Sequence, residues 1–139
     1  MRSAAYLPLN VMKRFLILTA IIEAATGLAL IALPAIVVRL LLGAEISGAS
    51  IPLGRVAGAA LLALGVACLL ARDDTQSRAA RGLVVAMLMY NIVATAVLAF
   101  AGIGLGLHGV ALWPAVFLHA AMAVWCVGCL RRSPQKLTD

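Results

Sequence analysis

Charged residues are scarce in this chain: they make up 12% of its 139 residues, whereas hydrophobic residues make up 65%. A soluble globular domain carries about a quarter charged residues and about half apolar ones. Together with a mean hydropathy of +1.12, this composition excludes a soluble class and predicts a protein of the lipid bilayer. The length leaves room for about four membrane spans of roughly 20 residues, with short connections and no separate soluble domain.

Two further classes of protein, nucleic-acid-binding proteins and disulfide-bonded secreted domains, are excluded because the chain lacks their features. Despite a formal net charge of +6, the chain lacks a basic face with interleaved aromatic or polar side chains, so no nucleic-acid partner is predicted. The three cysteines lie within or at the ends of apolar runs, unlike those of a disulfide-bonded secreted domain. Cys126 and Cys129 are interpreted as small apolar filler rather than a redox pair, and no metal site is predicted.

Four apolar runs predict transmembrane helices over residues 15–33, 52–71, 82–101 and 110–130. Between the first two, residues 35–43 are too short to span and carry Arg39 at their middle, so a short amphipathic helix at the membrane interface is expected. The predicted fold class is therefore all-α. We expect one integral membrane domain over residues 1–139, a four-helix bundle with this interfacial helix between its first and second spans.

The basic residues predict the orientation of the bundle. Nine of the eleven Lys and Arg residues fall near the two chain ends or in the connection between the second and third runs; the exceptions are Arg39 and Arg55. Because positively charged segments stay on the cytoplasmic side, the N-terminus, this connection and the C-terminus are all expected in the cytoplasm.

Each apolar run keeps its own polar residue. Glu23 lies in the first run, Arg55 in the second, Tyr90 and Asn91 in the third, and His119 in the fourth. With a rise of about 1.5 Å per residue, Glu23, Asn91 and His119 are predicted within roughly 2 Å of one plane. Arg55 is expected roughly 9 Å nearer the outer face. Ionisable residues inside a membrane are costly, and they are candidates for ligand binding or proton handling.

Two interpretations of this cluster stay open. In the functional one, Glu23 exchanges a proton or neutralises a cation, and His119 relays a proton. Tyr90 and Asn91 orient a ligand oxygen, and Arg55 holds an anionic or quinone-like head group near the outer face. In the structural one, Glu23 pairs with Arg55, while Asn91 and His119 form hydrogen bonds between helices.

Small residues follow one side of the second run. Gly54, Gly58 and Gly65, with Ala57 and Ala60, allow the backbone of another helix to come close. This pattern predicts a packing face, either inside the bundle or against another subunit.

The chain resembles the small four-helix bacterial membrane proteins of the broad DoxX-like type. The residues that carry the resemblance are Pro34 after the first run, Leu40 to Gly43, Gly54 to Gly58, Tyr90 with Asn91, and Trp113 and Pro114 followed by His119. The resemblance implies a bacterial inner-membrane bundle, and some members of this type are implied to be subunits of quinone-linked oxidoreductases. It carries over no catalytic residue.

The function expected first is that of an accessory subunit packed in a larger membrane complex, of the quinone-linked respiratory or electron-transfer kind. The alternative is a homo-oligomeric proton-coupled transporter, or a membrane protein that binds a small ligand through the Glu, Arg, Asn and His cluster. Quinone or lipid is the cofactor class considered, and the partners expected are the bilayer and other membrane subunits or further copies of the chain. No complete catalytic set is present, so no activity of its own is expected; a redox enzyme using His119, Tyr90 or the cysteines is the third alternative.

Overall fold

The computed structural model describes residues 6–132, and the side chains of residues 11–131. This part of the chain holds five helices and no strand: α1 (Tyr6–Ala32), α2 (Pro34–Leu42), α3 (Ser50–Ala71), α4 (Arg78–Ile103) and α5 (Leu112–Arg132). All except α2 are long and apolar enough to cross a membrane. The prediction of an all-α fold with four such helices is confirmed for these residues.

Several helix ends differ from those of the apolar runs that predict them. α4 begins at Arg78 rather than at residue 82, because Ser77 caps it: the Ser77 hydroxyl accepts the backbone N–H of Ala80 at 3.0 Å. An N-cap of this kind satisfies one of the amide groups that a helix start leaves unpaired. Hydropathy marks the apolar part of a helix, whereas backbone hydrogen bonding and capping decide where the helix ends.

A proline and a glycine delimit the short helix α2. α1 ends at Ala32, and Pro34 occupies the first turn of α2, where its missing N–H costs nothing. At the other end Gly43 adopts a left-handed conformation (φ 69°) and donates its N–H to the Arg39 carbonyl at 2.9 Å. That conformation favours glycine, so Gly43 ends the helix.

α1 and α3 are in contact through their backbones. A Cβ atom added at Gly58 would lie 2.7 Å from the Gly27 carbonyl oxygen, and one added at Gly65 would lie 2.9 Å from the Ala24 nitrogen. Such small residues let two helices approach closely. The predicted small-residue face therefore packs inside the bundle at Gly58 and Gly65, whereas Ala57 and Ala60 on the same helix stay exposed.

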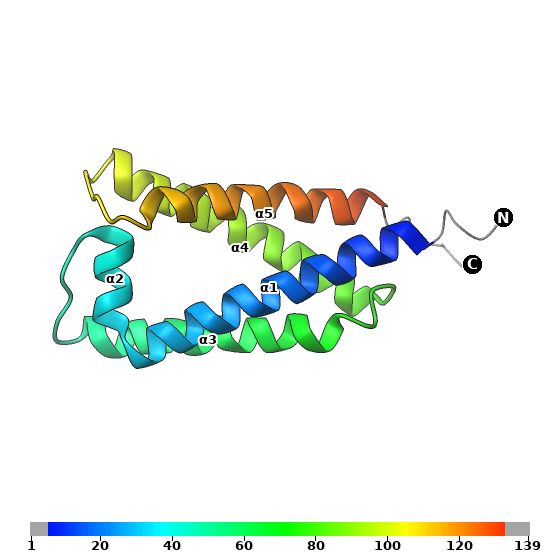
Figure 1. Cartoon of the computed structure of the whole chain (residues 1–139), viewed down its shortest axis with the longest axis horizontal. Coiled ribbons are helices and arrows are strands. Elements are labelled where there is room, and N and C mark those ends of the chain that lie inside the picture. Colours follow the sequence, from blue (N-terminus) through cyan, green and yellow to red (C-terminus); the bar gives the residue numbers. More distant parts are fainter. Residues whose placement is uncertain (1–5, 133–139) are drawn as a thin grey trace.

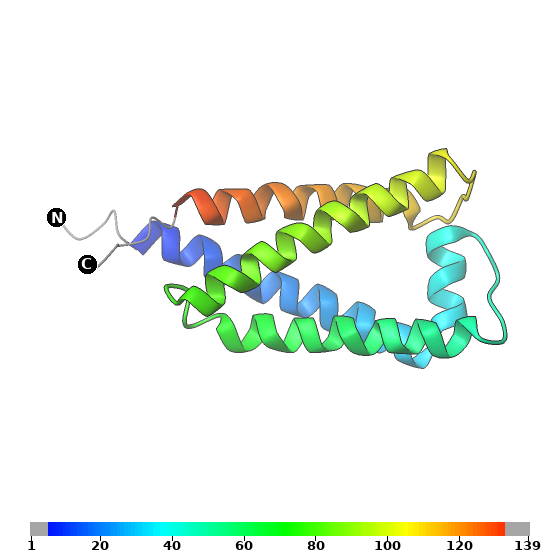
Figure 2. The same ribbon diagram turned by 180° about the vertical axis from the view of Figure 1, so that it is seen from behind.

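The four long helices form two pairs that diverge. Figure 1 shows α1 beside α3 and α4 beside α5, with the pairs meeting near the α3–α4 loop and separating toward α2. The view from behind agrees (Figure 2). Where the pairs meet, buried side chains of α1, α3, α4 and α5, among them Phe15, Met87 and Cys126, form the core. The Phe15 and Trp125 rings meet edge to face, with 5.8 Å between their centroids.

α2 lies across the open end of this arrangement (Figure 1). The Leu40 carbonyl accepts the backbone N–H of Ala111, just before α5, at 2.9 Å. Gly109 packs directly on the backbone of Leu40 and Leu41, leaving no room for a side chain. α2 is therefore held to both helix pairs: by the short link at Leu33 to α1, and by this backbone contact to the segment that leads into α5.

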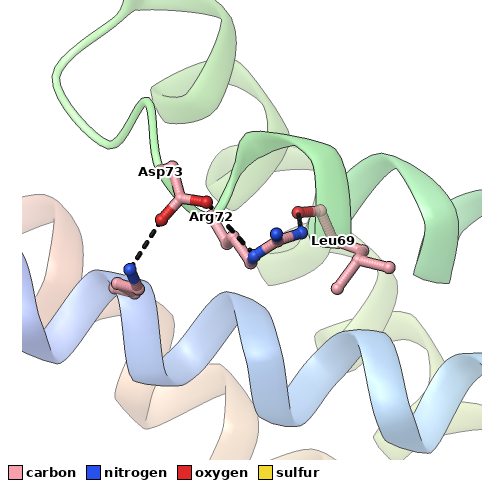
Figure 3. A network of polar contacts seen from close by, with 4 residues as sticks. Leu69, Arg72 and Asp73 are labelled. Carbon is pink, nitrogen blue, oxygen red and sulfur yellow. Dashed lines mark hydrogen bonds and ion pairs between the residues drawn. The ribbon is translucent and has the colours of Figure 1, made fainter.

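The opposite end of the bundle carries an ion-pair network (Figure 3). Lys13 on α1 donates to Asp73, in the α3–α4 loop, with 2.6 Å between Nζ and Oδ1. Arg72 Nε lies 3.2 Å from the other oxygen of Asp73, and the Arg72 guanidinium also donates to the Leu69 carbonyl. The hydrogen bond from Lys13 holds the pKa of Asp73 below its usual value.

Candidate functional site

A cavity of about 490 Å³ lies between the two helix pairs, beneath α2, and all five helices contribute to its wall. Its apolar wall includes Ile22 and Leu30 of α1, Leu40 and Leu41 of α2, Leu61 of α3, Val97 and Leu98 of α4, and Leu118 of α5. The polar side chains on the wall are Glu23, Thr26, Tyr90 and His119. The cavity exists because the helix pairs diverge and α2 is too short to fill the space between them.

Glu23 is joined to the opposite helix pair by a hydrogen bond. Its side chain is 4% exposed, and its carboxyl group accepts a hydrogen bond from the Tyr90 hydroxyl. Within residues 11–131, the ion pairs are Lys13 with Asp73, Arg39 with Glu45, and Arg72 with Asp73. None involves Glu23, so this carboxyl group has a phenol as its partner and receives no cation from the described side chains.

His119 is held by Asn91, one residue after Tyr90 on α4. His119 Nδ1 lies 2.8 Å from Asn91 Oδ1, and the Asn91 amide nitrogen donates to the Met87 carbonyl at 2.8 Å. Because Oδ1 can only accept, Nδ1 of His119 carries the proton. In the neutral ring Nε2 then keeps its lone pair, and it has no partner among the described residues. Asn91 itself is buried, with 1% of its surface exposed.

The two hydrogen-bonded residue pairs are joined by an aromatic contact between Tyr90 and His119. The Tyr90 and His119 rings meet edge to face, with 5.5 Å between centroids and 84° between planes. The contacts therefore run from Glu23 on α1 to Tyr90 on α4, then to His119 on α5, and back to Asn91 on α4. The structure brings together the four polar residues that the sequence places near one level of the bundle.

Arg55 does not belong to this group. It lies on the exposed surface of α3 and is not part of the cavity wall. The pairing of Glu23 with Arg55, one of the two alternatives that the sequence leaves open, does not form in the described part of the chain. Hydrogen bonding to Tyr90 takes its place.

The cysteines are placed in the core. Cys68, Cys126 and Cys129 take part in no disulfide and are buried where the helix pairs meet. Among the described residues, no group of three or more His, Cys, Asp or Glu side chains is arranged to hold a metal ion. The three cysteines lie among apolar side chains of the core, and the interpretation of Cys126 and Cys129 as filler stays a prediction.

Two threonines of α1 near Glu23 were not predicted. Thr26 lines the cavity three residues after Glu23, so the spacing of neighbours on one helix face was a signal that could have found it. Thr19 is fully buried, and its hydroxyl has no hydrogen-bond partner among the described residues. It lies one helical turn before Glu23, outside the cavity wall. The sequence predicts the short helix that became α2, but it does not indicate that this helix covers a cavity.

Models of known protein families, curated proteins and solved structures were compared with the chain, and none of them matches it.

Proposed function

We propose that this chain spans a membrane four times and binds a small, mostly apolar molecule in the cavity between its helix pairs. In this proposal Glu23, Tyr90 and His119 hold the polar end of the ligand, and the aliphatic wall surrounds the rest. The observation that carries it is the meeting of these three side chains at one place on an otherwise apolar wall. Small-molecule sites have this composition, with a few polar groups that orient the ligand.

The size of the cavity supports the same conclusion. Ligand sites in proteins enclose about 300–1,000 Å³, and this cavity has about 490 Å³. That volume suits part of a quinone-like ring with its chain, or one lipid tail with a small head group. A charged or strongly polar solute would meet too few polar groups on this wall to replace its hydration.

The membrane placement is part of the proposal. α2, with Arg39 in its last turn, lies at the outer interface and covers the cavity from that side. Lys13, Arg72 and Asp73 lie at the opposite end, which faces the cytoplasm of a bacterial cell by the excess of basic residues there. Reporter enzymes fused after residue 132 and inserted between residues 104 and 108 test this: activity on the same side in both fusions contradicts it.

The accessory-subunit role stays a compatible proposal, in which the cavity would serve a larger quinone-linked complex. Its support is reduced, because Gly58 and Gly65, which suggested a subunit-binding face, pack against α1. The proton-coupled transporter shares the same site and differs in requiring Glu23 to exchange its proton during turnover. Purification under mild detergent separates these roles: an accessory subunit is recovered with other membrane proteins, and a transporter is recovered alone or with its own copies.

Photochemical labelling in lipid nanodiscs tests ligand binding. A decyl chain carrying a diazirine is expected to crosslink the cavity wall near Glu23, Tyr90 and His119. Ala94→Phe places a ring on the cavity wall and should suppress this labelling, whereas Ala96→Phe, on the exposed side of the same helix, should not. Labelling confined to exposed positions, or unchanged by Ala94→Phe, contradicts the proposal.

A further inference from the structure

We infer that the cavity selects ligands whose polar end donates hydrogen bonds, through a hydroxyl or ammonium group, over ligands whose polar end only accepts them. This inference rests on the proposed ligand-binding function and names the chemical class of the ligand. For a quinone couple it means that the quinol, with its two O–H groups, fits better than the quinone, whose oxygens only accept.

Except for the Thr26 hydroxyl, the protein's own donors at the polar end are already used. The Tyr90 O–H group donates to Glu23. The Nδ1–H group of His119 donates to Asn91, and the Asn91 amide donates to the Met87 carbonyl. Asn91 is also buried away from the cavity wall. Each of these bonds removes a donor that could otherwise meet a ligand oxygen.

Hydrogen-bond acceptors at the same place lack donors. In its ionised form the Glu23 carboxyl group offers about four lone-pair positions, and the Tyr90 hydroxyl occupies one of them. The described residues supply Glu23 with no cation. Nε2 of the neutral His119 ring adds a further acceptor on the wall. The Thr26 hydroxyl can donate as well as accept, so acceptors outnumber donors where the ligand's polar end would lie.

Polar groups left unpaired by a bound ligand weaken its binding. A donor head group placed between Glu23 and His119 would satisfy both. A carbonyl or ether oxygen there would face two acceptors. Neither the ligand oxygen nor His119 Nε2 would gain a hydrogen bond, and Glu23 would keep only the one from Tyr90. In a site screened from water that difference is worth roughly ten- to hundredfold in affinity.

Competition for the photochemical label tests the inference in nanodiscs. Decanol, decylammonium and decyl methyl ether share one apolar chain and differ in the head group. At equal concentrations in the bilayer, decanol and decylammonium should reduce labelling of the cavity at least tenfold more effectively than the ether. The inference is supported whichever of decanol and decylammonium competes more strongly. The stronger competitor identifies the preferred head group.

The outcomes separate this inference from the function on which it rests. If the ether competes as well as decanol, the donor preference is overturned and ligand binding stands. If the probe fails to label the cavity at all, ligand binding itself fails.

Two variants test which residues produce the preference for donor head groups. Glu23→Gln replaces an acceptor oxygen with an amide donor, so the advantage of decanol over the ether should fall severalfold; an unchanged preference overturns the assignment. Tyr90→Phe frees an acceptor position on Glu23 and should keep or increase the preference, which makes it the second test if Glu23→Gln fails to fold. Met89→Leu, beside Tyr90 but exposed and outside the cavity wall, is the matched control.

Discussion

The Tyr90 hydroxyl on α4 donates a hydrogen bond to the Glu23 carboxyl group on α1, and this contact joins the two diverging helix pairs above their shared core. Because Glu23 has no cation among the described side chains, the phenol is its main stabilising partner. Tyr90 therefore stabilises the contact between the helix pairs and also lines the cavity. Replacing it should affect both the stability of the protein and ligand binding.

Replacing Tyr90 with Phe should destabilise the protein. The substitution removes only the hydroxyl, so the buried Glu23 carboxyl group loses its partner while the ring contact with His119 remains. Leaving such a group unpaired costs about 1–3 kcal/mol. Thermal unfolding in detergent measures the change, with Met89→Leu as control. A Tyr90→Phe protein as stable as the parent would mean that Glu23 has another partner.

The close crossing of α1 and α3 gives a prediction for glycine substitutions. Gly58→Ala places a methyl group against the Gly27 backbone and should lower the melting temperature, because neither backbone can yield without separating the helices. Gly82→Ala on α4 meets nothing within 4 Å and should be neutral or stabilising by up to about 1 kcal/mol, since alanine favours helix. Equal effects of the two substitutions would contradict the crossing.

The pair of Lys13 and Asp73 predicts a pH dependence. The pKa of Asp73 is lowered in the folded protein by the hydrogen bond from Lys13. Its contribution to stability is therefore present above the unfolded pKa of about 3.9 and is lost as the pH falls through the lower, folded value. Melting temperatures of the parent and of Asp73→Asn, measured from neutral pH to below pH 4, should converge at the acid end. Because both side chains are about half exposed, the difference at neutral pH should be small and should shrink in salt.

The docking of α2 depends on Gly109. A side chain there would collide with the backbone of Leu40 and Leu41, so Gly109→Ala should release α2 from the segment before α5. Hydrogen exchange of residues 34–42 should accelerate, while exchange in α1 and α3 stays unchanged. Gly128→Ala on α5 is the control, since an added Cβ there meets nothing within 4 Å. Unchanged exchange in α2 would show that the link at Leu33 alone holds it.

Much of the local structure could be predicted from the sequence. The four apolar runs, the break at Pro34 and the stop at Gly43 all correspond to helices and helix ends, because hydropathy, the missing N–H of proline and the conformational freedom of glycine act within a few residues. The helix starts were less accurate. Polar residues such as Arg78 continue a helix beyond its apolar run when a cap such as Ser77 satisfies its first turn.

The sequence predicted which polar residues share a level of the bundle, but it did not predict how they pair. Counting residues along each helix placed Glu23, Asn91 and His119 at one level, since the rise per residue of a helix is constant. Counting could not show which way each residue faces. Arg55 was the obvious partner for Glu23 by charge, yet it lies on the exposed side of α3.

The sequence by itself determined that this chain forms long apolar helices, where they break, and which polar residues share a level among them. Tertiary structure decided that Glu23 meets Tyr90, that His119 meets Asn91, and that a cavity remains between the pairs. The reason is that these helices are apolar on nearly every side, so hydropathy does not select the face that turns inward. That choice comes from contacts between distant segments, above all the backbone approach of Gly27 to Gly58 and the seating of α2 on Gly109.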